Sequence, residues 1–385
     1  MQFEYPPTPA GLATQGDLLF RGLQQIGVET YAVHLESTQE KEWYYRWFNP
    51  DVAVGVGYWG YTPDIILHPL KHGILPVPWL VADGYIALHQ EVLNSLPLIL
   101  LTSNWVRKVY MRDGIRPEGL AVLPVGCDTD LFVPRDQQEP RVAIIRKAFG
   151  VEPDELMILT VGGDGASKGA REVMEALALV KDDVPKWKYV VKGWPQPRTE
   201  AQNHSDWELA CQLGIQDHVV YATGRVSRNF MPYLINACDI YAGPSRLEGF
   251  GMPHVEAGAC EKPVIAVNAM AFQDTLVHGE TAFLAGVARE IVISETVLGE
   301  GAGERAGEHI VFDPPRIADY RASVPDLAEG FRLLLNDAGL RRQMGEAGRR
   351  RAVERFDYRV VARQFVDIVS QRIRPREEGL VELGS

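Results

Sequence analysis

The chain lacks the sequence features of several large protein classes. It has four cysteines in 385 residues, and no two of them form a Cys-x-x-Cys pair. This pattern disfavours both a disulfide framework and a zinc ribbon. No run of about 18 apolar residues is present, so we expect no membrane-spanning helix. The first residues contain neither a basic segment nor an apolar core, so we expect no secretory leader and a cytoplasmic protein with reduced thiols.

The chain also lacks a surplus of positive charge. Lys and Arg number 39 against 51 Asp and Glu, which gives a formal net charge of −12. This balance disfavours a polyanion-binding surface, so nucleic acid is not an expected partner. One basic stretch, with Arg107, Lys108, Arg112 and Arg116, would suit peripheral contact with an anionic membrane. A solvated helix face is the more common meaning of such a pattern, and membrane contact has no other support.

What is present is the composition of a globular protein. Apolar residues make up 46% and charged residues 23%, so a sizeable core can be buried, and the length favours two domains. Between residues 156 and 268, apolar strand-like runs alternate with helical patterns. This alternation predicts right-handed βαβ units in a parallel, doubly wound sheet.

The rest of the chain has a less regular pattern. Amphipathic helices are predicted at 16–27 and 358–373, and a further helix at 85–93. The segment 288–315 interrupts the alternation and predicts a β-hairpin. In the first third, apolar runs predict strands at "ETYAVHL" and within 51–59, 76–84 and 96–104.

Two acidic residues flank a glycine-rich turn in "RLEGFGMPHVEAG", residues 246–258. The apolar strand before the turn places Glu248 in a strand-to-helix loop, and Glu256 lies about one turn inside the following helix. Open α/β sheets bind ligands beyond the carboxyl ends of their strands, so both carboxylates can face one small volume. Two acids at this spacing are usually solvated surface groups, but their place in this frame favours a binding site.

This region resembles the signature of glycosyltransferase family 4. The stretch 243–266 matches the family's motif of Glu, seven residues and Glu. Three further stretches fit in the same order: "LPVGCDTDLFVP" (123–134), "SKG" (167–169) and "FDYRVVARQFVDI" (356–368). The resemblance is specific from about residue 120 to 285 and weaker before it.

The resemblance implies the α/β fold called GT-B, in which two Rossmann-like domains face each other across a cleft. The N-terminal, acceptor-side domain would cover residues 1–135 and the C-terminal, donor-side domain residues 136–356. A last helix in 357–375 would return to the first domain. The implied function is retaining, metal-independent transfer of a sugar from a nucleotide diphosphate donor to an unknown acceptor hydroxyl. The sugar nucleotide is a substrate, and no cofactor is expected.

The motif match assigns roles to individual residues. Glu256 would accept hydrogen bonds from the ribose hydroxyls and Glu248 from a donor-sugar hydroxyl, which suits acceptor-only carboxylates. Lys168 would stabilise the leaving diphosphate together with the helix N-terminus near Met252. Gly249 and Gly251 would leave room for a sugar close to the backbone. The remaining donor-site candidates are Phe250, Pro253, Arg225, Val226 and Gly11, the last of which could instead be a simple turn residue.

The chain departs from the family pattern at two positions. Gly163 stands where the family usually has an arginine, five residues before the lysine, so Arg171 and Lys192 are the candidate replacements. Asp83, preceded by Ala82, stands where the family has a histidine. It would either contact the sugar or acceptor as a catalytic-site residue or cap the helix predicted at 85–93. The nearby histidines, which we interpret as structural, are His68, His72 and His89.

Two other hypotheses for the function stay open. Epimerases and phosphorylases share the GT-B architecture, although the two-glutamate motif disfavours both. A catalytically degenerate protein that only binds sugar nucleotides is suggested by the missing arginine and histidine.

Overall fold

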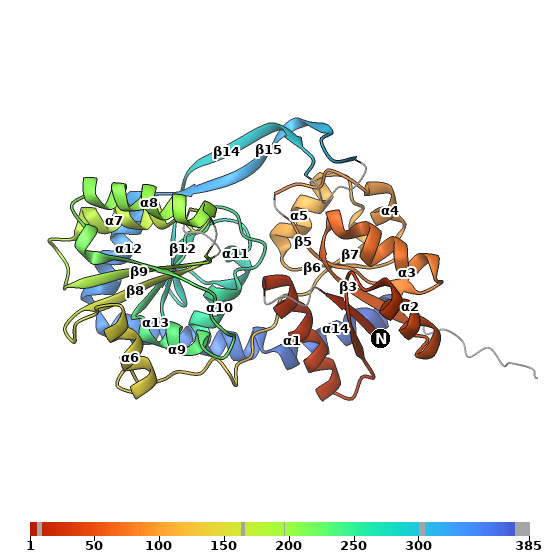
Figure 1. Cartoon of the computed structure of the whole chain (residues 1–385), viewed down its shortest axis with the longest axis horizontal. Coiled ribbons are helices and arrows are strands. Elements are labelled where there is room, and N and C mark those ends of the chain that lie inside the picture. The colour runs from red at the N-terminus through yellow and green to blue at the C-terminus, as the bar shows by residue number, and fades with distance from the viewer. Residues whose placement is uncertain (6–9, 83, 163–165, 196, 300–304, 374–385) are drawn as a thin grey trace, which may run out of the picture.

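The computed structural model describes residues 1–5, 10–82, 84–162, 166–195, 197–299 and 305–373. Two parallel α/β sheets lie side by side, and a long two-stranded hairpin spans the top of both in Figure 1. The described part of the chain has no helix long and apolar enough to cross a membrane.

The first sheet is built from the N-terminal third of the chain. Its strand order is β2-β1-β3-β5-β6-β7, with β4 beside β3, and all pairings are parallel. The strands are β1 (Gln2–Tyr5), β2 (Tyr31–His34), β3 (Val52–Tyr58), β4 (Leu75–Pro76), β5 (Trp79–Val81), β6 (Ile99–Leu101) and β7 (Leu120–Val122). The helices are α1 (Gly11–Gln25), α2 (Thr38–Trp47), α3 (His68–Lys71), α4 (Gln90–Ser95) and α5 (Asn104–Arg112).

The second sheet has the order β10-β9-β8-β11-β12-β13, again with parallel pairings throughout. This is the doubly wound dinucleotide-binding order, and its direction reverses between β8 and β11. The strands are β8 (Leu156–Val161), β9 (Trp187–Gly193), β10 (Val219–Thr223), β11 (Ile240–Ala242), β12 (Val264–Val267) and β13 (Ala282–Ala285). Around it lie α6 (Pro140–Ala148), α7 (Ala170–Val180), α8 (Pro197–Gln212), α9 (Met231–Ala237), α10 (Met252–Ala259), α11 (Phe272–Thr275), α12 (Val324–Asn336) and α13 (Ala338–Arg351).

The hairpin of β14 (Val287–Val297) and β15 (His309–Ala322) connects the two sheets. At its base, the backbone N–H of Tyr320 donates to the carbonyl of Arg246, at 2.8 Å. Near its tip, Tyr85 and Thr296 hydroxyls lie 3.1 Å apart, and Arg316 Nε lies 2.7 Å from an Asp113 carboxylate oxygen. The predicted hairpin is therefore confirmed, and it contacts the first domain as well as the second.

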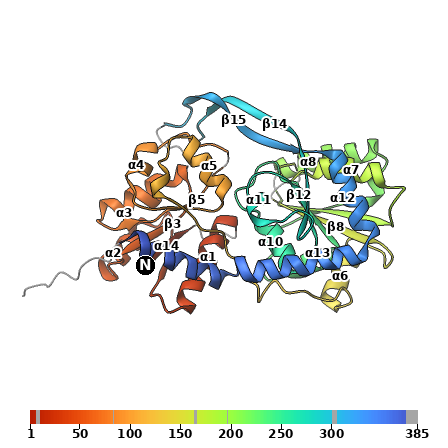
Figure 2. The same cartoon turned by 180° about the vertical axis from the view of Figure 1, so that it is seen from behind.

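The last helix, α14 (Tyr358–Arg372), packs against α1 beneath the first sheet, as Figure 2 shows from behind. Its apolar face is buried through Tyr358, Val361, Ala362, Phe365 and Val369. A Cβ on Gly22 of α1 would lie 2.7 Å from the carbonyl oxygen of Tyr358, so glycine permits this close approach. The predicted return of the last helix to the first domain is confirmed.

Some sequence-based elements need correction. Strand β1, which lies between β2 and β3, was not predicted, because only five residues precede the Pro6-Pro7 pair and no long apolar run marks it. The helix predicted at 85–93 is wrong over its first half, since α4 begins only at Gln90 and His89 has a positive φ of 69°. A cap at position 83 is therefore wrong, because a cap directly precedes its helix.

Candidate donor-binding site

Two loops meet at the point where the strand order of the second sheet reverses. One loop follows β8 and carries Lys168, and the other follows β11 and carries Glu248. Gly169 has a positive φ of 76°, and a Cβ there would lie 2.4 Å from the carbonyl oxygen of Pro244. The backbone N–H of Arg246 also donates to the carbonyl of Ser167, at 2.9 Å. Only glycine allows this close contact between the loops, which fixes the position of both charged side chains.

Lys168 and Glu248 form an ion pair although 80 residues separate them in sequence. Lys168 Nζ lies 2.8 Å from Glu248 Oε2, and the side chains are 22% and 18% exposed. The other oxygen, Glu248 Oε1, accepts a hydrogen bond from the backbone N–H of Gly251, at 3.2 Å. Burial alone would raise the pKa of Glu248, but the Lys168 charge and these hydrogen bonds outweigh it, so the pKa is lowered. Glu248 is therefore a fixed, ionised carboxylate.

Glu256 is paired with a cation that the sequence analysis did not identify. Arg228, in the loop after β10, places Nη1 2.6 Å from Glu256 Oε1. The guanidinium also lies over the Phe132 ring, 4.7 Å from its centroid. Burial raises the pKa of Glu256 more than Arg228 lowers it. The only available signal for Arg228 was its place in a loop at the carboxyl edge of the same sheet.

The two glycines of the acidic loop contact segments outside it. Gly251 has φ of 87°, and a Cβ there would lie 2.7 Å from the Phe272 ring. The carbonyl of Gly249 accepts a hydrogen bond from Thr102 of the first domain, at 3.0 Å. In this structure Gly251 therefore allows close packing of the loop against Phe272, and the expectation that both glycines leave room for a sugar stays a prediction.

The neighbouring candidates are held mainly by packing. The Phe250 ring is buried against Phe356, with centroids 5.7 Å apart. Met252 and Pro253 are the first two residues of α10, so Pro253 takes the second helical position rather than the first. The amide of Gly251, directly before this helix, donates to Glu248.

The two candidate replacement cations differ in their surroundings. Lys192 is the second-last residue of β9 at the carboxyl edge of the sheet and is 5% exposed, and its side chain makes no hydrogen bond or ion pair within the described ranges. Burial, and then the charge of Arg225, lower the pKa of Lys192. Arg171 is instead paired with buried Asp206 of α8, at 3.1 Å.

The remaining candidates are placed as follows. Arg225 and Val226 lie exposed after β10, and Arg225 stands over the Trp194 ring, 5.7 Å from its centroid. Gly11 begins α1, and a Cβ there would have nothing within 4 Å. Two predicted residues, Gly163 and Asp83, lie outside the described residues.

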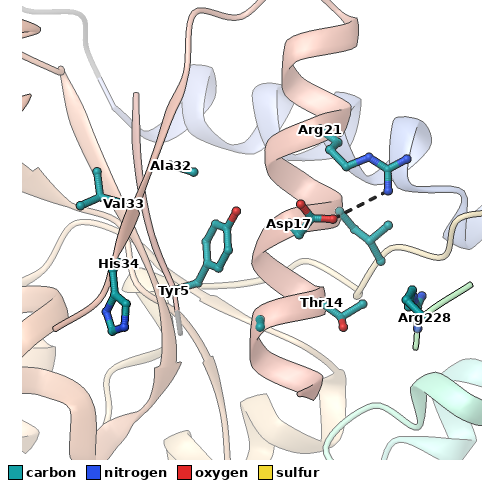
Figure 3. Close-up of a pocket in the computed structure, with 10 residues that line it drawn as sticks. Tyr5, Thr14, Asp17, Arg21, Ala32, Val33, His34 and Arg228 are labelled. Atoms are coloured by element: carbon teal, nitrogen blue, oxygen red, sulfur yellow. Dashed lines mark ion pairs between the residues drawn. The ribbon is translucent and has the colours of Figure 1, made fainter. Parts of the chain in front are cut away.

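A cavity of about 480 Å³ lies mainly against the first sheet. Figure 3 shows Tyr5 between β2 and α1, His34 below it, and Arg228 on the other side of α1. On α1, Asp17 and Arg21 form an ion pair at 3.7 Å, with side chains 47% and 41% exposed. Arg228 therefore contacts Glu256 and also lines this cavity, so it connects the donor-side loops with the first domain.

Comparison with curated proteins finds relatives among sugar transferases. The chain is 29% identical over 293 residues to MMP α-(1→4)-mannosyltransferase of Mycolicibacterium hassiacum, covering 75% of this chain and 58% of that protein. It is 28% identical over 266 residues to D-inositol 3-phosphate glycosyltransferase of Rhodococcus erythropolis, covering 68% and 55%. The chain thus spans little more than half the length of these relatives.

Solved structures share the fold over nearly the whole chain. The Anabaena protein HepE in complex with UDP aligns with a TM-score of 0.70 and 15% identity, covering 96% of this chain and 99% of that one. A glycosyltransferase from Rickettsia africae aligns with a TM-score of 0.75 and 16% identity, covering 97% and 98%. Residues 142–297 match the family described as Glycosyl transferases group 1. The chain therefore has the GT-B fold that its resemblance to family 4 implied, and residues 142–297 are similar to the group 1 glycosyltransferases.

Proposed function

We propose that the chain is a retaining glycosyltransferase that moves a sugar from a nucleotide diphosphate donor to an acceptor hydroxyl. The observation that carries this proposal is the Lys168–Glu248 pair at the reversal point of the second sheet, with Nζ and Oε2 2.8 Å apart. Ligands of doubly wound sheets bind in the crevice at such a point. The names of the relatives and the UDP and UDP-glucose complexes of HepE support a sugar nucleotide as donor.

The ion pairs of the site explain how a dianionic donor would be held. Before binding, Lys168 and Glu248 neutralise each other, which lowers the cost of keeping both charges partly buried. A diphosphate brings new negative charge to Lys168, and Glu248 is then free to accept a hydrogen bond from a sugar hydroxyl. Glu256 would accept from the ribose, with Arg228 holding its carboxylate in place.

The reaction itself needs no nucleophile from the protein. The bond between the anomeric carbon and the phosphate oxygen breaks, and the acceptor oxygen forms the new bond on the same face. The acceptor proton passes to an oxygen of the leaving diphosphate. Negative charge grows on the diphosphate during this step, so Lys168 stabilises the transition state more than the bound donor. We propose that no metal ion takes part in this step.

Lys192 is the stronger candidate for the second cation. Its side chain is buried at the carboxyl edge of the sheet without a partner among the described residues, whereas Arg171 already binds Asp206. A buried ammonium without a counterion is unfavourable, and a phosphate oxygen would correct this. The acceptor would then bind from the first-domain side, in the cavity lined by Tyr5, Thr14 and His34.

Incubation of the purified chain with a panel of sugar nucleotides tests the proposed function. UDP-glucose is the first donor, followed by donors with other bases and sugars. We expect release of the nucleoside diphosphate and, once an acceptor is found, a product with the donor's anomeric configuration by NMR. Added Mg²⁺ or Mn²⁺ should not raise the rate. Donor binding without transfer or hydrolysis across the panel would contradict the proposal and favour the degenerate, binding-only protein.

A further inference from the structure

Two histidines of the first domain meet a glutamate on the neighbouring helix. His68 and His72 lie four residues apart at the two ends of α3, and Glu42 lies on α2. Each residue offers one ligand atom, and these atoms all lie within 4.8 Å of one another. Among the described residues, this is the only group of three or more such side chains with ligand atoms this close.

The spacing of the cluster is close to that of a zinc site. His72 Nε2 lies 3.4 Å and His68 Nε2 3.9 Å from Glu42 Oε1. In a tetrahedral zinc site with bonds of about 2.0–2.2 Å, neighbouring ligand atoms lie about 3.3–3.6 Å apart. Small side-chain movements would therefore bring all three atoms into coordination.

Three imidazole nitrogens of this cluster lack a hydrogen-bond partner in the described part of the structure. Both ring nitrogens of His68 and Nε2 of His72 are buried and make no hydrogen bond there. Buried polar atoms are nearly always paired, so an unpaired set facing one carboxylate points to a ligand. The three side chains are 17–32% exposed, so an ion can still reach them from solvent.

The surrounding charges are compatible with a bound cation. Lys41, which precedes Glu42 on α2, places its ammonium 2.7 Å from Glu4 Oε2 and 2.6 Å from the carbonyl of Asp64. Glu4 therefore neutralises it. Glu42 supplies the negative charge of the cluster, and its carboxylate oxygen Oε1 faces both imidazoles.

We propose that Glu42, His68 and His72 bind a divalent transition metal, zinc being the best match, with water at the fourth position. Two imidazoles and a carboxylate are a common ligand set for zinc. Helices α2 and α3 lie on the side of the first sheet away from the second sheet (Figure 1), so the metal would fasten α3 to α2 and take no part in sugar transfer. His68 Nδ1 has no second-shell partner among the described residues, so we expect an affinity about 10–100-fold below that of a fully supported site.

Titration of zinc into the chelator-treated full chain, monitored by isothermal titration calorimetry, tests this site. We expect one ion per chain and a rise in thermal unfolding temperature with zinc. Co²⁺ should give the visible absorption of a tetrahedral site. Glu42→Gln, a conservative change on a partly exposed helix, should weaken zinc binding at least about tenfold, and His68→Gln with His72→Gln should abolish it.

His204→Gln is the matched control, since His204 is 75% exposed on α8 in the second domain. It should bind zinc like the parent. Equal zinc binding by the parent and the His68/His72 double variant would overturn the site, as would a parent that binds none. A donor turnover that falls more than twofold on zinc removal would overturn the structural role while leaving the proposed function intact.

Discussion

The two sides of the cleft hold their charges in different ways. On the donor side, the carboxylates of Glu248 and Glu256 are 18% and 5% exposed, and each contacts a cation within 2.8 Å. On the first-domain side, Asp17 and Arg21 are 47% and 41% exposed and 3.7 Å apart. Exposed pairs are weak and easily rearranged, whereas partly buried pairs are held in place by their surroundings. The donor side is therefore organised before any ligand binds, while the side we assign to the acceptor can adjust.

The largest effect should come from removing the helix that joins the two sides. Deleting residues from Asp357 onward would expose the apolar surface covered by α14, whose Phe365 and Val361 are fully buried. Each such side chain contributes about 1.5–3 kcal/mol, so we expect aggregation or a large loss of stability. Size-exclusion chromatography and thermal unfolding check this. A truncated chain that stays monomeric and turns over donor normally would show that α14 is dispensable.

The next-largest effect should distinguish the partly buried Lys168–Glu248 pair from the exposed Asp17–Arg21 pair. Lys168→Ala should lower turnover of the preferred donor by about 10²–10³-fold, because it removes a preorganised cation from the leaving group. Its effect on donor affinity should be smaller, since the charge develops mainly at the transition state. Steady-state kinetics of diphosphate release gives both values.

Asp17→Asn is the matched control on the first-domain side, because it removes only the exposed pair with Arg21 and leaves the 2.9 Å contact between Arg21 and Asp128 in place. Donor hydrolysis by this variant should stay within about fivefold of the parent. An equal loss of turnover in the Lys168 variant and in this control would show that burial of the ion pair does not distinguish the two sides. Lys192→Ala and Arg171→Ala in the same assay show which cation assists, and we expect the larger loss for Lys192→Ala.

A smaller effect is expected for binding alone. Glu256→Ala should weaken donor binding about 10- to 100-fold, since charge-assisted hydrogen bonds contribute about 1.5–3 kcal/mol each. Isothermal titration calorimetry measures the change, and circular dichroism checks that the variant folds. Unchanged affinity in a folded variant would refute the ribose role of Glu256.

The smallest effect concerns pH. Burial raises the pKa of Glu256 above its ordinary 4.5, so this carboxyl keeps its proton to higher pH than an exposed one. Only the ionised form is a pure acceptor, so donor affinity should increase as pH rises through the raised pKa, by at most about tenfold per pH unit. Glu248, with its lowered pKa, stays ionised over this range. Calorimetry with Glu256→Gln should show a flat profile, and an identical slope in both proteins would assign the titration elsewhere.

The second sheet and its acidic loop could be predicted from sequence because their signals are local. Apolar strands of three to seven residues are mostly closed by glycine, and the candidate ligand residues follow at the carboxyl ends. Arg228 was not predicted because its contact with Glu256 joins a loop to helix α10, 28 residues away, and no local pattern marks it. The contacts of Gly249 and Gly251 could not be predicted, because the Phe272 ring and Thr102 come from other segments of the chain.

The contact between the two histidines and Glu42 also depends on tertiary packing that no local sequence pattern indicates. His68 and His72 are four residues apart, which places them on one helix face, but no sequence pattern indicates that α2 packs beside them. Their interpretation as structural residues was made without Glu42. The pairing depends on how α2 and α3 pack over the first sheet, and that is a tertiary property.

A crystal structure with the donor bound tests the central claim most directly. The account predicts that the Lys168–Glu248 pair, now 2.8 Å apart, opens so that Lys168 Nζ contacts a phosphate oxygen. The ribose hydroxyls should lie within hydrogen-bond distance of Glu256, and the first-domain cavity beside Tyr5 and His34 should contain no part of the nucleotide. A diphosphate bound in that cavity, with the Lys168–Glu248 pair unchanged, would contradict the account.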